Sequence, residues 1–331
     1  MAKARAAPAA SMRAAAIDRF GPPSVITVHS VPLPKPGRRQ ILIALHAAGV
    51  GSWDESIRDG SWRPAGRSRF PLILGTDGAG IVVATGAGVR RFRVGDRAYA
   101  YEAGNPKGGF YAEYVAVDES KAGLVPRRLG LLQAGAAAVT GLTALQGIDN
   151  ALKVRKGETV LIFGASGAVG TLAVQFAKRL RARVLATASG RRAIALVRRL
   201  GADAVIDARR SDAAERLREL TPDGIDAVLA LAGGDELERC LDFVRDAGRI
   251  AHPNGVEPEP KQRRRFRIRA YDAVSGPRQF AQLGRAVMRA KLSVPIAAAY
   301  PLAAAAAAHR RQRRQVIGRI VLRIHRKNRG R

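Results

Sequence analysis

A glycine-rich turn between Phe163 and Thr171 carries the clearest chemical signal in this sequence. It follows an apolar run of strand length, and apolar positions recur after it at helical spacing. Small residues let the backbone approach a pyrophosphate, and the free N–H groups of a helix start attract its charge. A plain strand-to-helix turn is the alternative, and the flanking pattern disfavours it. The predicted cofactor contacts here are Gly164, Ser166, Gly167, Ala168, Val169 and Gly170.

The end of the second predicted strand favours NADP(H) over NAD. An NAD site usually places Asp or Glu there, about 20 residues after the turn, to bind the ribose 2′-hydroxyl. This chain instead has Ser189, Arg191 and Arg192 around Gly190, and no carboxylate in that stretch. A hydroxyl and two guanidinium groups suit a 2′-phosphate. The alternative is that both arginines only begin a solvated helix in an Arg-rich protein.

The chain is strongly basic, with 57 Lys and Arg against 27 Asp and Glu and a net charge of +30. Such a field attracts nucleic acid or anionic lipid. The arginines are scattered, and aromatic residues make up only 5%, so bases have few stacking platforms. We therefore expect nucleic-acid or membrane binding to be non-specific, and composition bias remains the simpler interpretation of the charge.

Length and cysteine content set further limits. The 331 residues suffice for two domains with separate cores. The single cysteine, Cys240, excludes a disulfide framework and a multi-cysteine zinc site. We find no apolar run near the roughly 20 residues of a membrane helix, and we expect a cytoplasmic protein.

Patterning divides the chain into four segments. Residues 1–11 are Ala-rich and basic and are expected to be a flexible extension, with a transit-like role left open. Residues 12–124 alternate short apolar runs with turn residues, which predicts a mostly antiparallel, barrel-like domain. Residues 125–270 alternate strand and helix patterns, which predicts a doubly wound parallel sheet. Residues 271–331 return to strand pattern and end in a basic tail. We expect the first and last pieces to pack together, with the active site in the cleft beside the nucleotide domain.

Several motifs, taken together, resemble the medium-chain dehydrogenase/reductase superfamily, most closely its zinc-independent quinone oxidoreductase (zeta-crystallin-like) branch. The resemblance covers about Met12 to Ile324 and implies an α/β fold with a GroES-like barrel-type catalytic domain and a Rossmann nucleotide-binding domain. It also implies a homodimer. The motifs, in family order, are His46–Val50 with Asp54, Phe70–Gly80, Val94–Arg97, Gly109–Tyr114, Ala138–Leu145, the glycine turn, Leu200–Asp203 and Gly318–Leu322.

The family's zinc-dependent members carry a Cys where this chain has Gly51, and a Gly-His-Glu motif where it has Gly75, Thr76 and Asp77. The five histidines form no ligand-spaced cluster, so we expect no metal. Hydride delivery to an already electrophilic acceptor suits such a site.

Residue by residue, the resemblance places Thr140 near the nicotinamide ribose and gives Ser189 and Arg191 the 2′-phosphate. Zeta-crystallin-like members often have Asn in place of Gly51 and Tyr in place of Ser56, so the proton donor stays open. The candidate pocket residues are Ser56, Asp54, Trp53 and Thr140. For Asp54 and Asp77 a structural role is an equal alternative, and for Trp53 and Trp62 packing is the default role.

The sequence thus predicts an NADPH-dependent oxidoreductase that reduces a quinone or an α,β-unsaturated carbonyl compound without zinc. An enoyl-thioester reductase of the same superfamily is the first alternative. A non-catalytic NADPH-binding protein with nucleic-acid or membrane affinity is the second.

Overall fold

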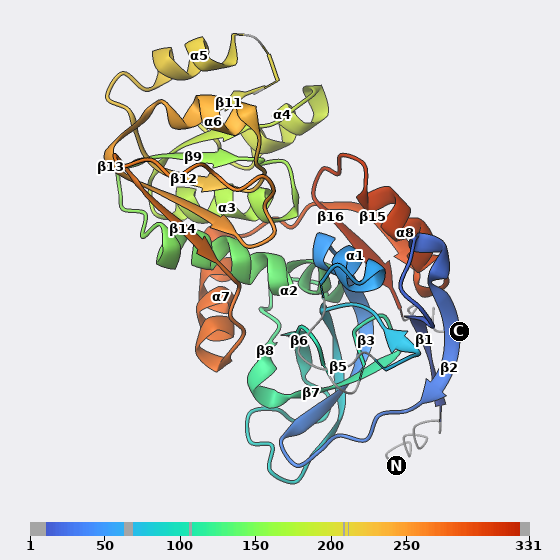
Figure 1. The fold of residues 1–331 in the computed structure, drawn as a ribbon. Coiled ribbons are helices and arrows are strands. Elements are labelled where there is room, and N and C mark those ends of the chain that lie inside the picture. Colours follow the sequence, from blue (N-terminus) through green and yellow to red (C-terminus); the bar gives the residue numbers. More distant parts are fainter. Residues whose placement is uncertain (1–10, 63–68, 106–107, 208, 211, 325–331) are drawn as a thin grey trace.

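The computed structural model describes residues 11–62, 69–105, 108–207, 209–210 and 212–324. Two units lie against each other, a barrel-like unit and a layered α/β unit (Figure 1). Nearly all of the expected N-terminal extension, and the end of the basic tail, lie outside the described residues. Ser11 already belongs to the first strand, where it pairs with Pro32.

The barrel-like unit is built on a long central strand, β3 (Gln40–Val50). Its apolar and β-branched residues are mostly buried, and β5, β7 and β16 all pair with it in antiparallel fashion. The other strands of the unit are β1 (Ser11–Ile17), β2 (Thr27–Pro32), β4 (Leu72–Ile73), β5 (Asp77–Thr85), β6 (Arg97–Tyr101), β7 (Tyr114–Asp118), β8 (Ala122–Leu124), β15 (Ile296–Pro301) and β16 (Arg319–Arg323). The expected β-rich first segment and its pairing with the last segment are therefore confirmed.

Two helices of this unit escaped the sequence analysis. The first, α1 (Ser52–Asp59), interrupts the region predicted to be β structure and ends at Gly60, whose backbone is left-handed with φ 82°. The second, α8 (Ala305–Gln312), lies between β15 and β16. Both are eight residues long, too short for their apolar spacing to stand out from the surrounding strands.

The α/β unit contains a six-stranded sheet in the order β11-β10-β9-β12-β13-β14. Every neighbouring pair is parallel, which is the doubly wound arrangement of a dinucleotide-binding sheet. The strands are β9 (Thr159–Phe163), β10 (Arg183–Thr187), β11 (Ala204–Ile206), β12 (Ile225–Ala230), β13 (Val244–Pro253) and β14 (Arg267–Tyr271). The expected Rossmann fold is therefore confirmed.

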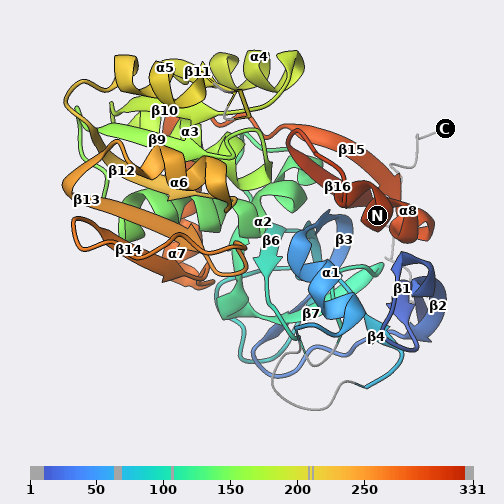
Figure 2. The same cartoon turned by 45° about the horizontal axis from the view of Figure 1, so that its top comes forward.

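Helices cover both faces of this sheet (Figure 2). One core joins α2, α3, α4 and α7 to the sheet, and a second core joins α5 and α6 to its other face. The helices are α2 (Leu131–Gln146), α3 (Ala168–Arg179), α4 (Arg191–Arg199), α5 (Ala213–Leu220), α6 (Asp235–Leu241) and α7 (Pro277–Ala290). Val244, three residues after the end of α6, begins β13 and pairs with Ile225.

One helix corrects the expectation that no run reaches membrane-spanning length. Together with the turn after it, α2 forms a 21-residue apolar helix from Leu131 to Ala151. Of its most apolar window, 72% is buried inside the fold. It is therefore a core helix, packed against α3, α7 and β3.

Candidate active site

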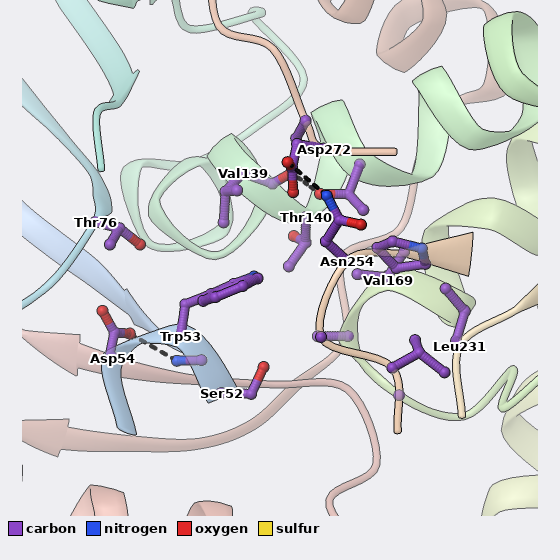
Figure 3. A pocket seen from close by; sticks show the side chains of 18 of the residues that line it. Ser52, Trp53, Asp54, Thr76, Val139, Thr140, Val169, Leu231, Asn254 and Asp272 are labelled. Atoms are coloured by element: carbon purple, nitrogen blue, oxygen red, sulfur yellow. Dashed lines mark hydrogen bonds between the residues drawn. The ribbon is translucent and has the colours of Figure 1, made fainter. Parts of the chain in front are cut away.

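A cavity of about 810 Å³ opens between the two units. The glycine turn, the end of β12 and the loop after β13 line one side, and residues of α1 and its neighbouring strands line the other (Figure 3). The residues that line it include Gly51, Trp53, Asp54, Trp62, Thr76, Thr140, Gly164, Gly167–Gly170, Asn254, Glu257, Asp272 and Arg319. Both units therefore line one cavity, and the active site expected in the cleft between them stays a prediction.

The glycine turn has the geometry that a pyrophosphate requires. Gly164 is left-handed, with φ 83°, and its N–H donates to Oγ1 of Thr187 at 2.8 Å. A Cβ at position 170 would lie 2.5 Å from the carbonyl oxygen of Gly164, so only glycine lets α3 pack this closely. Gly167 caps α3 without a side-chain acceptor, which leaves the first N–H groups of the helix available for a phosphate. The residues of this turn therefore fit the dinucleotide that they are predicted to hold.

The end of β10 differs from the expectation in one respect. Arg191 and Arg192 are exposed at the start of α4, as a 2′-phosphate site would need. Ser189, however, donates through Oγ to Oδ1 of Asp207 at 2.9 Å. Asp207 follows β11, so the neighbouring strand supplies a carboxylate that spacing from the glycine turn did not reveal. The three residues Ser189, Arg191 and Arg192 are not among the described residues lining the cavity.

The candidate pocket residues separate into two groups. Thr140 lines the cavity, and its hydroxyl donates to the carbonyl oxygen of Ala136 at 2.7 Å within α2. Trp53 and Trp62 also line it, with ring centroids 5.2 Å apart and planes at 64°. Ser56 is not among the described lining residues, and its carbonyl oxygen accepts the N–H groups of Gly60 and Trp62.

A buried ion pair forms part of the cavity wall. Arg319 donates from Nη2 to Oδ1 of Asp77 at 3.0 Å, and Asp77 also accepts the N–H of Val139. Burial raises the pKa of Asp77, while the guanidinium opposes that rise. A Cβ at position 51 would lie 2.9 Å from Nη1 of Arg319, so Gly51 leaves the room that the guanidinium occupies. Sequence reasoning did not single out Arg319.

Asp54 begins a chain of buried polar side chains at this wall. Its Oδ2 accepts the N–H of Gly51 at 2.8 Å and the hydroxyl of Tyr111 at 3.1 Å. Its Oδ1 is buried and has no hydrogen-bond partner within the described part of the chain. Burial raises the pKa of Asp54 to about 7, against the opposing effect of Arg319. In Figure 3 the side chain lies beside Trp53 and below Thr76.

Behind Asp54, the series of hydrogen-bonded side chains continues through Tyr111 to His309 on α8. The hydroxyl of Tyr111 lies 3.2 Å from Nε2 of His309, and Nη1 of Arg58 lies 3.1 Å from its Nδ1. Burial and the adjacent Arg58 lower the pKa of His309 to about 4, so its ring is neutral near pH 7. The sequence offered no sign of this arrangement, because His309 is 251 positions from Arg58. Among the described residues, no group of three His, Cys, Asp or Glu is placed to hold a metal ion.

Comparison with known proteins agrees with this architecture. Residues 37–127 match the family of alcohol dehydrogenase GroES-like domains, and residues 168–267 match the zinc-binding dehydrogenase family. The quinone oxidoreductase of Sus scrofa is 30% identical over 310 residues, which are 90% of this chain and 93% of that protein.

Two solved structures extend the likeness to the whole fold. An NAD-dependent alcohol dehydrogenase superposes with a TM-score of 0.88 at 30% identity, covering 95% of this chain and 100% of that one. A mycobacterial protein in complex with NADPH superposes with a TM-score of 0.81 at 28% identity, covering 94% of this chain and 99% of that one. The chain thus belongs to the medium-chain dehydrogenase/reductase superfamily, in its quinone oxidoreductase branch.

Proposed function

We propose that this protein is an NADPH-dependent reductase of quinones or α,β-unsaturated carbonyl compounds. The observation that carries the proposal is a cavity lined by the pyrophosphate-type turn on one side and by Trp53, Trp62 and Arg319 on the other. NADPH bound there would supply the hydride. The NADPH complex of the mycobacterial relative supports this cofactor, and the name of the Sus scrofa relative, quinone oxidoreductase, supports a quinone acceptor.

The cavity walls suit a flat, electrophilic acceptor. The edge-to-face pair of Trp53 and Trp62 offers an apolar surface against which a planar ring packs. Arg319 holds a positive charge on the same side of the cavity, and such a charge stabilises the negative charge that develops on an acceptor oxygen during reduction. Because the site is buried, that attraction is stronger than it would be in water.

Cofactor choice depends on the adenosine end of the site. We assign the 2′-phosphate of NADPH to Ser189, Arg191 and Arg192, since hydroxyl and guanidinium groups are its natural partners. Asp207 opposes this assignment in part, because its carboxylate holds the Ser189 hydroxyl. Exposed Arg191 therefore carries the larger share of the expected preference.

The test is NADPH consumption by the purified protein with a small quinone and a small enone, with NADH run in parallel. We expect turnover with NADPH and little with NADH. Arg191→Asp should raise the Michaelis constant for NADPH by about 10- to 100-fold and leave that for NADH nearly unchanged. Equal use of both cofactors would refute the 2′-phosphate assignment alone. Turnover only with an enoyl thioester would change the proposed substrate to an enoyl thioester. No turnover with any acceptor would refute the proposed reductase function.

We also propose an oligomeric state and a cellular location. A homodimer would form through the outer edge of β14, which has a sheet neighbour only in β13 among the described strands. A cytoplasmic location would suit the single free thiol of buried Cys240. Sizing chromatography of the protein, with a proline substituted at Ile268 in β14, tests the dimer.

A further inference from the structure

The direction of the hydrogen bonds behind the cavity can be worked out from the chemistry of one residue. Arg58 has only N–H donors, so Nδ1 of His309 must accept its bond. The proton of the neutral imidazole therefore sits on Nε2 and is donated to the Tyr111 oxygen. The Tyr111 hydroxyl in turn donates to Oδ2 of Asp54. In this series of hydrogen bonds, each donor therefore lies on the side away from Asp54, and Asp54 is the final acceptor.

This direction decides which oxygen of Asp54 carries a proton. Oδ2 already accepts two donors, the Tyr111 hydroxyl and the Gly51 N–H. A proton on Oδ2 would compete with both. Oδ1 is buried and accepts no bond from the described residues, and Asp54 is one of the residues that line the cavity. When Asp54 is protonated, the acid hydrogen therefore lies on Oδ1, with no acceptor among the residues that the structure describes.

The charged groups around Asp54 leave this acid form accessible near neutral pH. Arg319 of β16 favours the carboxylate, whereas Asp77 of β5 and the complete burial of the side chain favour the acid. Behind Tyr111, neutral His309 of α8 faces Arg58 and, further out, Glu55 of α1. Burial dominates among these effects, and it holds the pKa of Asp54 at about 7.

We propose that Asp54 is the proton donor of the reaction, giving its Oδ1 hydrogen to the acceptor oxygen, and that His309 is a positioning residue acting through Tyr111. The inference rests on the proposed reductase function. When an enone accepts a hydride at its β-carbon, the displaced π electrons move to the carbonyl oxygen and form an enolate. The O–H bond of Asp54 then breaks, a new O–H bond forms on that oxygen, and Asp54 remains as a carboxylate. NADPH is the hydride source, and water reprotonates Asp54 after product release.

Other polar groups at the wall are poor donors. Arg319 does not release a proton in proteins. Burial and the nearby Asp54 raise the pKa of Tyr111 well above its usual value, and its hydrogen is held by Oδ2. Asp272 accepts a 2.7 Å bond from Nδ2 of Asn254, and Glu257 is exposed. Burial raises the pKa of Tyr101, which also lines the cavity, to about 12. Among the lining carboxyl groups, Asp54 is the one that is fully buried and has an oxygen without a partner in the described part of the chain.

The first test is Asp54→Asn, which reproduces the shape and hydrogen bonds of the acid form but has no proton to give. We expect kcat with an enone to fall by about 100- to 10,000-fold, the range for loss of a general acid, with the dissociation constant for NADPH unchanged. The wild type should lose kcat as pH rises through about 7, and the variant should lack this decline. Wild-type rates and an unaltered pH profile in the variant would overturn the inference. A wild type inactive with every acceptor would overturn the proposed function instead.

The second test reads the proton directly, in the cofactor-free protein. The infrared carbonyl stretch of a protonated carboxylic acid should disappear with a midpoint near pH 7, and it should be missing in Asp54→Asn. The matched control is Asp149→Asn, since burial also raises the pKa of Asp149, which pairs with Arg179 away from the cavity. That control should keep both the band and the turnover. If the band disappears only in Asp149→Asn, or if the wild type shows no such band, Asp54 carries no proton.

The third test separates positioning from structure. His309→Leu removes the donor to Tyr111, which weakens the bond to Oδ2, so the infrared midpoint of Asp54 should rise. His309→Gln offers an oxygen to Arg58 and an N–H to Tyr111, so it should restore the midpoint and the pH profile of kcat. An unchanged midpoint in both variants, with Asp54 still titrating, would remove His309 from the mechanism.

Discussion

The buried carboxyl of Asp54 makes the stability of the protein depend on pH in a way that one substitution removes. The ordinary pKa of an Asp is 3.8, and burial raises that of Asp54 to about 7. The folded state therefore binds this proton more tightly than the unfolded state does. The resulting stabilisation is fully present below pH 3.8 and is lost as pH rises through about 7. Asp54→Asn keeps the shape of the acid form and has nothing to titrate.

The size of the effect follows from the pKa values. A rise of about three pKa units corresponds to about 4 kcal/mol, at about 1.4 kcal/mol per unit. We expect the free energy of unfolding of the wild type, relative to Asp54→Asn, to fall by up to that amount between pH 4 and pH 8. For a cooperative unit of roughly 150–250 residues, this is a relative shift in Tm of about 8–16 °C.

Melting curves recorded by circular dichroism from pH 4 to pH 8 measure this difference. Asp54→Asn should match the wild type in acid and melt above it at pH 8. Asp223→Asn is the control, because Asp223 is exposed, and its Tm difference from the wild type should stay flat. A constant difference between the wild type and Asp54→Asn across the range would refute the claim that the native carboxyl is protonated.

Three further predictions concern the walls of the site. Arg319→Met should destabilise the fold by about 3–5 kcal/mol, because it leaves Asp77 buried without its ion partner. Chemical denaturation measures this loss, and adding Asp77→Asn in a double variant should recover most of it. Purely additive losses would contradict the pairing. Gly170→Ala should weaken NADPH binding by about 10-fold or more in a fluorescence titration, because the new Cβ would meet the Gly164 carbonyl oxygen at 2.5 Å; wild-type affinity would show that the turn yields easily. Trp53→Ala should raise the Michaelis constant for a quinone by about 10-fold and leave NADPH affinity intact. The reason is that an aromatic contact contributes about 0.5–1.5 kcal/mol beyond the area it buries. An unchanged Michaelis constant for the quinone would show that the acceptor binds elsewhere.

Some features of the site were within reach of the sequence because their causes are local. The glycine turn is one example: close packing of α3 on β9 needs a missing side chain at Gly170, and the neighbouring residues show the strand and helix that create this need. The same holds for the alternation of strands and helices that predicts the parallel sheet, since each element is visible in its own residues. The short helix α1 escaped because eight residues carry too little periodicity.

Contacts between distant parts of the chain were beyond reach. Asp207 meets Ser189 only because β11 lies beside β10 in the sheet, so spacing from the glycine turn gave no sign of it. Arg319 and Asp77 are 242 positions apart, and Tyr111 and His309 are 198 apart. Their meeting depends on β16 joining the sheet beside β3 and on α8 packing against the same core.

The sequence by itself determined the fold class, the nucleotide turn and the family, because each depends on short patterns of neighbouring residues. Only the tertiary structure decided the chemistry of the other wall. Whether Asp54 is an acid or a carboxylate depends on how completely water is excluded from it and on which charges surround it. Those charges come from Asp77 on β5 and Arg319 on β16, and a hydrogen bond comes from Tyr111; only folding brings them within reach of one carboxyl group.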